Sequence, residues 1–192
     1  MPIRTIFPPR FRVIPASAKL VFKGQIHDVY QWEQIQYDGT TATFEMLKRP
    51  DTIHVIAIKD HKMVVLREQQ PSFDEFYGLP GGFHDVENEN ELQGAQREVL
   101  EETGMTFQSW RLIEAYQPNS KIDQFAYLFL ATDFVSQTHQ HLDAGEKIEI
   151  TLMDHKTALE LAQTKPARYL PAQLLANVAS IDELANLPDF AA

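Results

Sequence analysis

The segment Leu79–Met105, LPGGFHDVENENELQGAQREVLEETGM, constrains this chain more than any other stretch of its sequence. A glycine pair, Gly81-Gly82, leads into a helical pattern in which Glu98 and Glu102 lie four residues apart. Residues at that spacing share one face of a helix, and Glu101 lies beside them. Like charges so placed repel one another and destabilise a bare helix. The fold therefore needs a compensating positive charge on this face.

A divalent cation is the natural compensation, and hard oxygen ligands favour Mg²⁺ or Mn²⁺. The chain has no cysteine, which excludes thiolate metal sites, disulfide scaffolds and thiol nucleophiles. Arg97, four residues before Glu101, is placed to orient that carboxylate, and the glycine pair lets the backbone approach a cation or a phosphate. For the three glutamates alone, the competing interpretation is a solvated acidic helix face that follows a tight turn.

The complete string resembles the signature of the Nudix hydrolase family, G-x5-E-x7-R-E-U-x-E-E-x-G-U, in which U is a bulky aliphatic residue. Here the run Arg97–Met105, REVLEETGM, follows the pattern without a gap. Glu89 stands at the expected distance before Arg97, but six residues instead of five separate it from Gly82. Either the loop carries a one-residue insertion, or Glu87 takes part of the role of Glu89.

The resemblance covers roughly residues 50–155 and implies both a fold and a reaction. The implied fold is an α/β/α sandwich with a mixed sheet. The implied reaction is hydrolysis of a nucleoside diphosphate linked to another moiety, with Mg²⁺ or Mn²⁺ as cofactor. An acidic protein can bind such an anion because metal ions invert the local charge. The implied ligands are Glu98, Glu101, Glu102 and the backbone carbonyl of Gly81, with Arg97 and Glu89 as their orienting partners.

The segments around the signature, DTIHVIAI, MVVLREQQP and FYGLPGGF, are similar to the branch of the family that cleaves ADP-ribose and nucleotide sugars. Members of that branch often form a homodimer through an amino-terminal β subdomain. They commonly carry an Arg and a Glu where this chain has Pro71 and Gly78. Arg49 or Arg67 is a candidate to replace the missing phosphate contact, and Trp32 is a candidate to stack on a base or to pack a dimer interface.

In the same branch a flexible acidic loop before a late strand supplies the general base. The matching stretch here is 141–149, HLDAGEKIE. Glu146 is the first candidate for that base and Asp143 the second, and Gly145 could give the loop its mobility. Glu149 and the helix residue Glu101 are the alternatives if neither carries the role.

Elsewhere, hydrophobic periodicity predicts a mixture of strands and helices around an irregular arm at 1–18 and a loop at 71–88. Asp38-Gly39 marks a hairpin, and Gly104 ends the glutamate-bearing helix. The expected strands are Leu20–Lys23, Val29–Tyr37, Thr41–Leu47, Ile53–Ile58, Met63–Leu66, Arg111–Tyr116, Phe125–Ala131 and Ile148–Met153, and the expected helices are Asn90–Thr103, His155–Gln163 and Pro171–Ser180. We expect a layered α/β (α+β) chain in two parts. These are an arm and β meander at 1–48, for dimerisation or substrate binding, and a hydrolase domain with carboxyl-terminal helices at 49–192.

Charge and hydropathy exclude other classes of protein. The chain has 17 basic and 27 acidic side chains, a formal charge of −10 that disfavours general nucleic-acid binding. No apolar run approaches the ~18 residues of a membrane span. The amino-terminal residues also lack the pattern of a secretory signal. The sequence therefore predicts a cytoplasmic protein without a membrane partner.

The leading hypothesis is a metal-dependent pyrophosphatase that acts on ADP-ribose or a nucleotide sugar. One alternative is a Nudix-like domain that senses a nucleotide without hydrolysing it. Another is a hydrolase of nucleoside triphosphates, dinucleoside polyphosphates or CoA derivatives. The intact REVLEE run favours a catalyst, because a pure binding module does not need crowded carboxylates.

Overall fold

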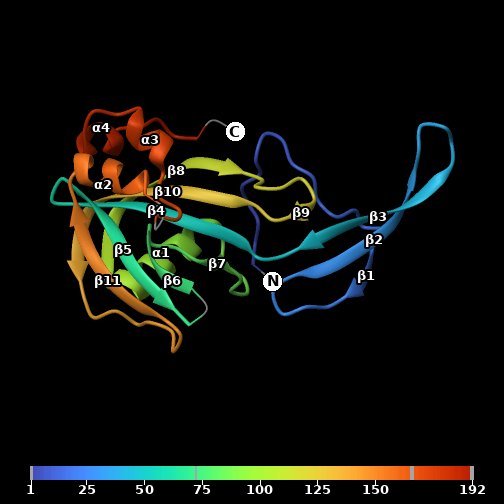
Figure 1. The fold of residues 1–192 in the computed structure, drawn as a ribbon, viewed down its shortest axis with the longest axis horizontal. Coiled ribbons are helices and arrows are strands. Elements are labelled where there is room, and N and C mark those ends of the chain that lie inside the picture. The colour runs from blue at the N-terminus through green and yellow to red at the C-terminus, as the bar shows by residue number, and fades with distance from the viewer. Residues whose placement is uncertain (1, 72, 165–166, 191–192) are drawn as a thin grey trace.

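The computed structural model describes residues 2–71, 73–164 and 167–190, which form a mixed α/β fold of two sheets and four helices (Figure 1). Among these residues no helix is long and apolar enough to cross a lipid bilayer. Residues 2–18 contain no helix or strand, as the prolines of the arm predict.

The smaller sheet extends to one side of the molecule (Figure 1). Its strand order is β1-β2-β3-β9, with β1 at Lys19–Phe22, β2 at Asp28–Ile35, β3 at Thr41–Lys48 and β9 at Ile122–Asp123. The hairpin predicted at Asp38-Gly39 joins β2 to β3, and Gly39 takes a positive φ of 84° in the turn. The last strand, β9, comes from the second half of the chain and pairs in parallel with β3, so the meander is completed by a distant segment.

The larger sheet has seven strands and positions the glutamate-bearing helix. The order is β11-β5-β4-β10-β8, with β6 paired to β5 and β7 paired to β4. Strands β4 and β10 are parallel and their other pairings are antiparallel, so the sheet is mixed as expected. The bounds are β4 Asp51–Lys59, β5 Lys62–Gln70, β6 Phe73–Gly78, β7 Phe83–His84, β8 Met105–Tyr116, β10 Ala126–Gln137 and β11 Lys147–Met153.

Helices cover both faces of this sheet. Helix α1 (Glu91–Thr103) packs Ala95 and Val99 against one apolar cluster, which includes Ile53 and Val55 of β4. The opposite face is covered by α2 (His155–Ala162), α3 (Ala172–Ala176) and α4 (Ile181–Ala185). Alternate residues of β4 therefore point to different layers, as strand geometry requires. The expected α/β/α sandwich is confirmed.

Two expectations about individual elements are wrong. The stretch 71–88, expected as a loop, contains β6 and β7, because its backbone pairs with the edge of β5 and with the start of β4. The helix expected at Pro171–Ser180 is instead the short α3, and α4 follows it. The side chain of Ser180 accepts a hydrogen bond from the Glu183 N–H and so begins a second helix.

Candidate active site

The glycine pair lies where the loop after β6 meets β4. The carbonyls of Pro80 and Gly82 accept hydrogen bonds from the Val55 and Ile53 N–H groups, at 2.8 and 3.0 Å. Gly81 has a φ of 150°, and a Cβ there would overlap the Ile53 carbonyl oxygen. A Cβ on Gly82 would lie 2.7 Å from Glu98 Oε2. A glycine at position 81 is therefore needed for the loop to lie directly against β4, and Gly82 lies beside the Glu98 carboxylate.

Helix α1 begins and ends on specific capping contacts. Its N-cap residue Asn90 accepts from the Gln93 N–H, and the Gln93 side chain accepts from the Asn90 N–H, which completes a capping box. At the other end Gly104 adopts a left-handed φ of 68° and donates its N–H to the Leu100 carbonyl. These caps fix the register that turns Glu98 and Glu102 toward the glycine loop.

Arg97 joins the helix glutamates to the loop. Its guanidinium donates through Nη1 to Glu98 Oε1 at 2.8 Å and to Glu101 Oε2 at 3.0 Å. Through Nε and Nη2 it contacts both carboxylate oxygens of Glu89, at 2.9 and 3.2 Å, and Nη2 also donates to the Phe83 carbonyl. The structure thus gives Glu89 the contact with Arg97. Asn88, the residue before Glu89, adopts a left-handed φ of 63°.

Each of the three helix glutamates keeps one carboxylate oxygen without a protein donor. Glu98 and Glu101 use one oxygen each for Arg97, and Glu102 Oε2 accepts the Gly81 N–H at 2.7 Å. Within the described ranges no donor bonds to their other oxygens, Glu98 Oε2, Glu101 Oε1 and Glu102 Oε1. Three uncommitted anionic oxygens beside a close backbone approach are what a hard cation binds.

Burial makes this group of acids costly to ionise. Desolvation raises the pKa of Glu98 to about 7, with the nearby charges of Glu101 and Glu146 adding to the effect. Burial likewise raises the pKa of Glu102 well above its usual value, and Glu68, Glu98 and Glu146 add to it. For Glu68, burial and the Glu146 charge raise the pKa to about 7. Five carboxylates, Glu68, Glu98, Glu101, Glu102 and Glu146, thus act on one another at this site.

Glu68 is a member of this group that the sequence reasoning missed as a site residue. It lies on β5 at only 8% exposure, and its Oε1 would be 3.2 Å from a Cβ on Gly78. Strand alternation was the available signal, because Val64 and Leu66 of β5 face α1 and Glu68 follows on the same face.

The loop that carries Glu146 is attached to the end of α1. The N–H groups of Thr138 and His141 donate to the carbonyls of Gly104 and Glu101, both at 2.8 Å. Gln140 Nε2 donates to the Glu102 carbonyl and, at 3.4 Å, to that of Ile148. Both ends of the 141–147 loop are therefore held near the helix, which keeps Glu146 close to Glu98 and Glu102.

The two other acids considered as general base lie in different places. Asp143 is on the same loop as Glu146, and its N–H donates to Glu146 Oε2 at 3.2 Å. Glu149 lies on β11 opposite Arg67 of β5 and forms an ion pair with it. Because Val65 faces the layer of α2 to α4, Arg67 shares that face and lies on the other side of the sheet from the helix glutamates.

The remaining predicted binding residues lie in two different places. Arg49 is near the loop, with its guanidinium 5.0 Å from the centre of the Phe83 ring. Its buried Nε has no hydrogen-bond partner. Trp32 lies on β2 of the smaller sheet against Phe44, with ring centroids 4.9 Å apart. The structure does not bring Trp32 together with the glutamates, since the smaller sheet projects away from α1 (Figure 1).

A small open pocket of about 180 Å³ lies on the other face of β4. Its lining includes His54, Tyr116, Tyr127 and Tyr169. His54 stacks on Tyr169 with ring centroids 4.5 Å apart, and its buried Nδ1 has no partner. The backbone of His54 also adjoins Gly81. His54 and Tyr169 thus form part of an aromatic surface on the face of β4 opposite the helix glutamates.

The carboxylate oxygens of the helix glutamates are ligands of the type that a divalent cation prefers. Among the described residues no three His, Cys, Asp or Glu side chains already stand in a metal-binding arrangement. The oxygens without donors are nevertheless all hard ligands, and burial together with the neighbouring acids raises the pKa values of Glu98 and Glu102. A bound Mg²⁺ or Mn²⁺ would add positive charge to this group.

Comparison with known families decides the classification. A family model described as the NUDIX domain matches residues 48–174. The chain belongs to the Nudix family. The resemblance drawn from the REVLEETG run is thereby confirmed.

Two further similarities support this assignment. The chain is 26% identical over 149 residues to the ADP-ribose pyrophosphatase of Bacillus subtilis (strain 168), covering 76% of this chain and 80% of that protein. It also resembles the crystal structure of an ADP compounds hydrolase with a TM-score of 0.67 and 16% identity, covering 84% of this chain and 90% of the other. At that identity the structural match establishes the Nudix fold alone.

Proposed function

We propose that this Nudix hydrolase cleaves the diphosphate of ADP-ribose or of a nucleotide sugar with the help of Mg²⁺ or Mn²⁺. The observation that carries the proposal is the arrangement of Glu98, Glu101 and Glu102 beside the Gly81 loop. Arg97 binds one oxygen each of Glu98 and Glu101, the Gly81 N–H binds one of Glu102, and no donor among the described residues binds their other oxygens. The similarity to an ADP-ribose pyrophosphatase supports this substrate class.

Each residue of the proposed active site has a distinct role in the reaction. Glu98, Glu101, Glu102 and the Gly81 carbonyl would hold the metal, and Arg97 and Glu89 would keep those carboxylates oriented. A bound divalent cation would supply charge neutralisation at the diphosphate and a more acidic attacking water. Glu146 would accept the proton of that water as its oxygen attacks one phosphorus. The phosphorus–oxygen bond to the bridging oxygen then breaks, and two phosphate monoesters leave.

The general-base assignment has a direct kinetic test. We expect Glu146→Gln to lower kcat by about 10²- to 10⁴-fold with KM and Mn²⁺ affinity little changed, as loss of a general base should. Asp143→Asn and Glu149→Gln are the matched controls, because each neutralises a nearby acid. If either control shows the larger loss, the role passes to that residue. If all three variants retain activity, Glu101 becomes the candidate.

The substrate class is tested with a panel of diphosphates. Wild-type protein is assayed on ADP-ribose, nucleotide sugars, a nucleoside triphosphate, a dinucleoside polyphosphate and a CoA derivative, with Mg²⁺ or Mn²⁺, and monoester products are counted through an added phosphatase. Highest kcat/KM on ADP-ribose or a nucleotide sugar is expected. A preference for another compound would replace the substrate. Binding without turnover across the panel would favour the nucleotide-sensing alternative.

We also propose a homodimer formed through the smaller sheet. Strands β1 and β2 leave large apolar side chains in solvent, including Val21 at 51%, Phe22 at 60% and Ile35 at 76% exposure. A small sheet with such a surface gains stability from a partner. Sedimentation at micromolar concentration should give twice the chain mass, and a monomer there would refute the dimer. Cytoplasmic location and the absence of nucleic-acid or membrane partners stay predictions.

A further inference from the structure

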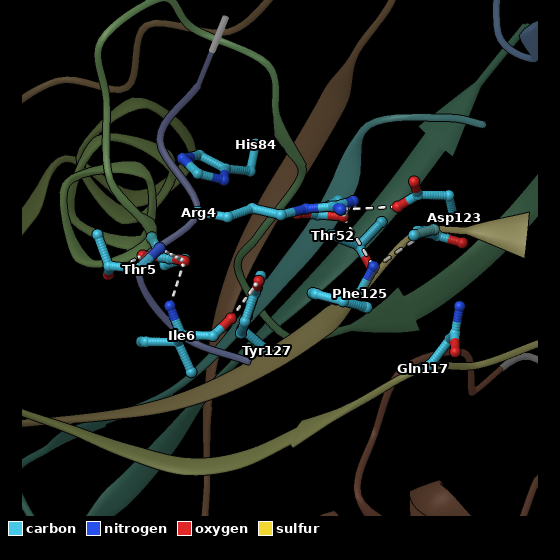
Figure 2. A network of polar contacts seen from close by, with 12 residues as sticks. Arg4, Thr5, Ile6, Thr52, His84, Gln117, Asp123, Phe125 and Tyr127 are labelled. Carbon is cyan, nitrogen blue, oxygen red and sulfur yellow. Dashed lines mark hydrogen bonds and ion pairs between the residues drawn. The ribbon is translucent and has the colours of Figure 1, made fainter. Parts of the chain in front are cut away.

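The amino-terminal arm reaches the start of α1, far from it in the sequence (Figure 2). The Thr5 N–H donates to Glu91 Oε1 and the Thr5 hydroxyl to Glu91 Oε2, both at 2.6 Å. The Ile6 N–H donates to Glu91 Oε1 at 2.9 Å. Glu91, the first residue of α1, is fully buried. Its carboxylate therefore depends on these three donors, because a buried charge must be hydrogen-bonded to be tolerated.

The arm also holds the residue on the other side of the N-cap. The Ile3 N–H donates to the Glu89 carbonyl at 2.8 Å, and the same carbonyl contacts His84 Nε2 at 2.9 Å. The N-cap Asn90 thus stands between two residues that the arm holds. The arm fixes the turn from which α1 starts.

A third anchor keeps the arm in place. Arg4 contacts both carboxylate oxygens of Asp51 at 2.6 Å and Asp123 Oδ1 at 2.7 Å, and its guanidinium lies 4.4 Å from the Phe125 ring centre. The Tyr127 hydroxyl donates to the Ile6 carbonyl at 3.1 Å (Figure 2). These partners lie on β4, β9 and β10 or between them, so residues 3–6 bridge the sheets and the helix.

The turn held by the arm is the one that carries the Arg97 clamp. The carbonyl of Glu89 binds the arm while its carboxylate binds Arg97. Arg97 in turn holds Glu98 and Glu101. A continuous path of hydrogen bonds therefore runs from the arm through one residue, Glu89, to the oxygens proposed to bind metal.

We propose that residues 3–6 are a positioning element of the active site, which sets the Glu89–Arg97 clamp by holding the turn at Glu89–Glu91. Thr5 and Glu91 are its positioning residues, and neither touches substrate or metal. The inference rests on the proposed function only for its effect on metal binding. The effect on the helix itself is independent of that function.

Thr5→Val tests the arm's hold on the turn, because it removes the hydroxyl that binds Glu91 and keeps the side-chain shape. The matched control is Thr43→Val, since the Thr43 hydroxyl donates to Glu33 at 2.9 Å on the exposed hairpin of the smaller sheet. We expect Thr5→Val to weaken the binding of Mn²⁺ alone by about 3- to 10-fold, below the loss typical of groups that contact a metal ligand directly. Thr5→Ser should restore the wild-type affinity, and Thr43→Val should not change it.

A double-mutant cycle separates positioning from general stability. If the arm acts through Glu89, the effect of Thr5→Val on Mn²⁺ affinity should vanish in a Glu89→Gln background. Additive effects in that cycle would overturn the proposed path. Glu91→Gln, which changes the same contact from the helix side, should act in the same direction as Thr5→Val and guards against a folding defect of one variant.

Hydrogen exchange makes the test independent of catalysis. Amides in the first turn of α1 should exchange about 10-fold faster in Thr5→Val than in wild type or Thr43→Val. Unchanged exchange and unchanged Mn²⁺ affinity would refute the inference. If wild type neither binds Mn²⁺ nor hydrolyses any diphosphate, the proposed function fails. The exchange rates would still decide whether the arm holds the helix.

Discussion

Two clusters in this protein each join one arginine to several carboxylates, but they differ in whether every carboxylate oxygen has a hydrogen-bond donor. Arg4 joins Asp51 and Asp123, and Arg97 joins Glu89, Glu98 and Glu101. In the Arg4 cluster every carboxylate oxygen has a protein donor, because the N–H groups of Phe125 and Ile14 complete the set.

The Arg97 cluster, by contrast, leaves oxygens of Glu98 and Glu101 without one. In a closed cluster the protein itself satisfies every carboxylate oxygen, whereas an open cluster has capacity for a ligand. The difference distinguishes a candidate ligand site at Arg97 from a structural contact at Arg4. Removing one charge from each cluster should therefore have opposite consequences.

The largest effect is expected on turnover, from the open cluster and the adjoining Glu102. Glu98→Gln and Glu102→Gln should each lower kcat/KM by about 10³-fold or more, since several kcal/mol of charge stabilisation by the metal is lost. Stability without metal should stay level or rise, because each change relieves repulsion among buried acids. Steady-state kinetics at saturating Mg²⁺ and urea unfolding in a chelator measure the two outcomes. Near-normal rates would show that the metal ligands lie elsewhere, and Glu160→Gln on α2 is the control.

In the closed cluster, removal of one charge should lower the free energy of unfolding. Arg4→Met removes the cation from two buried aspartates and is expected to cost about 3–5 kcal/mol of unfolding free energy. The urea midpoint should fall accordingly. Arg10→Met, a change of the same type elsewhere on the arm, should cost little. A midpoint for Arg4→Met equal to that of wild type would mean that the two clusters do not differ as described.

The smallest expected effect is on the pH dependence of stability, and it concerns the buried His54, which belongs to neither cluster. Burial lowers the pKa of His54 to about 4, so the folded protein keeps this imidazole neutral while the unfolded chain protonates near pH 6.5. The unfolded state then binds more protons as pH falls, and about 2 kcal/mol of stability should be lost between pH 7 and pH 5. His54→Phe should remove this part of the acid dependence. An unchanged slope in urea titrations across that range would show that His54 does not cause it.

Much of the site was predictable because it is local in sequence. Glu98, Glu101 and Glu102 share a helix, and the common face of Glu98 and Glu102 and the cap at Gly104 follow from spacing along one segment. The role of Glu89 beside Arg97 was implied by the family signature instead. The nearly continuous apolar runs of β4 and β5 were predictable as strands because that signal is also local.

The parts that sequence reasoning missed depend on contacts between distant segments. Glu68 joins the acids only because β5 lies beside β11 and under α1. Strand β6 has a loop-like composition and is a strand because the edge of β5 is available to it. The arm was expected to be an irregular lead-in, since nothing near Thr5 in the sequence indicates its partner Glu91. Tertiary pairing of this kind carries no local signature.

The Arg4 cluster also affects how the chain folds. Arg4 and Asp123 are separated by 119 positions along the chain, and Thr5 and Glu91 by 86. During synthesis the first of these segments therefore emerges long before either of its partners exists. Contacts of such long range close late and slow folding, because loop entropy must be lost before they form. We therefore expect residues 3–6 to dock late onto β4, β9, β10 and α1, although they are synthesised before these partners.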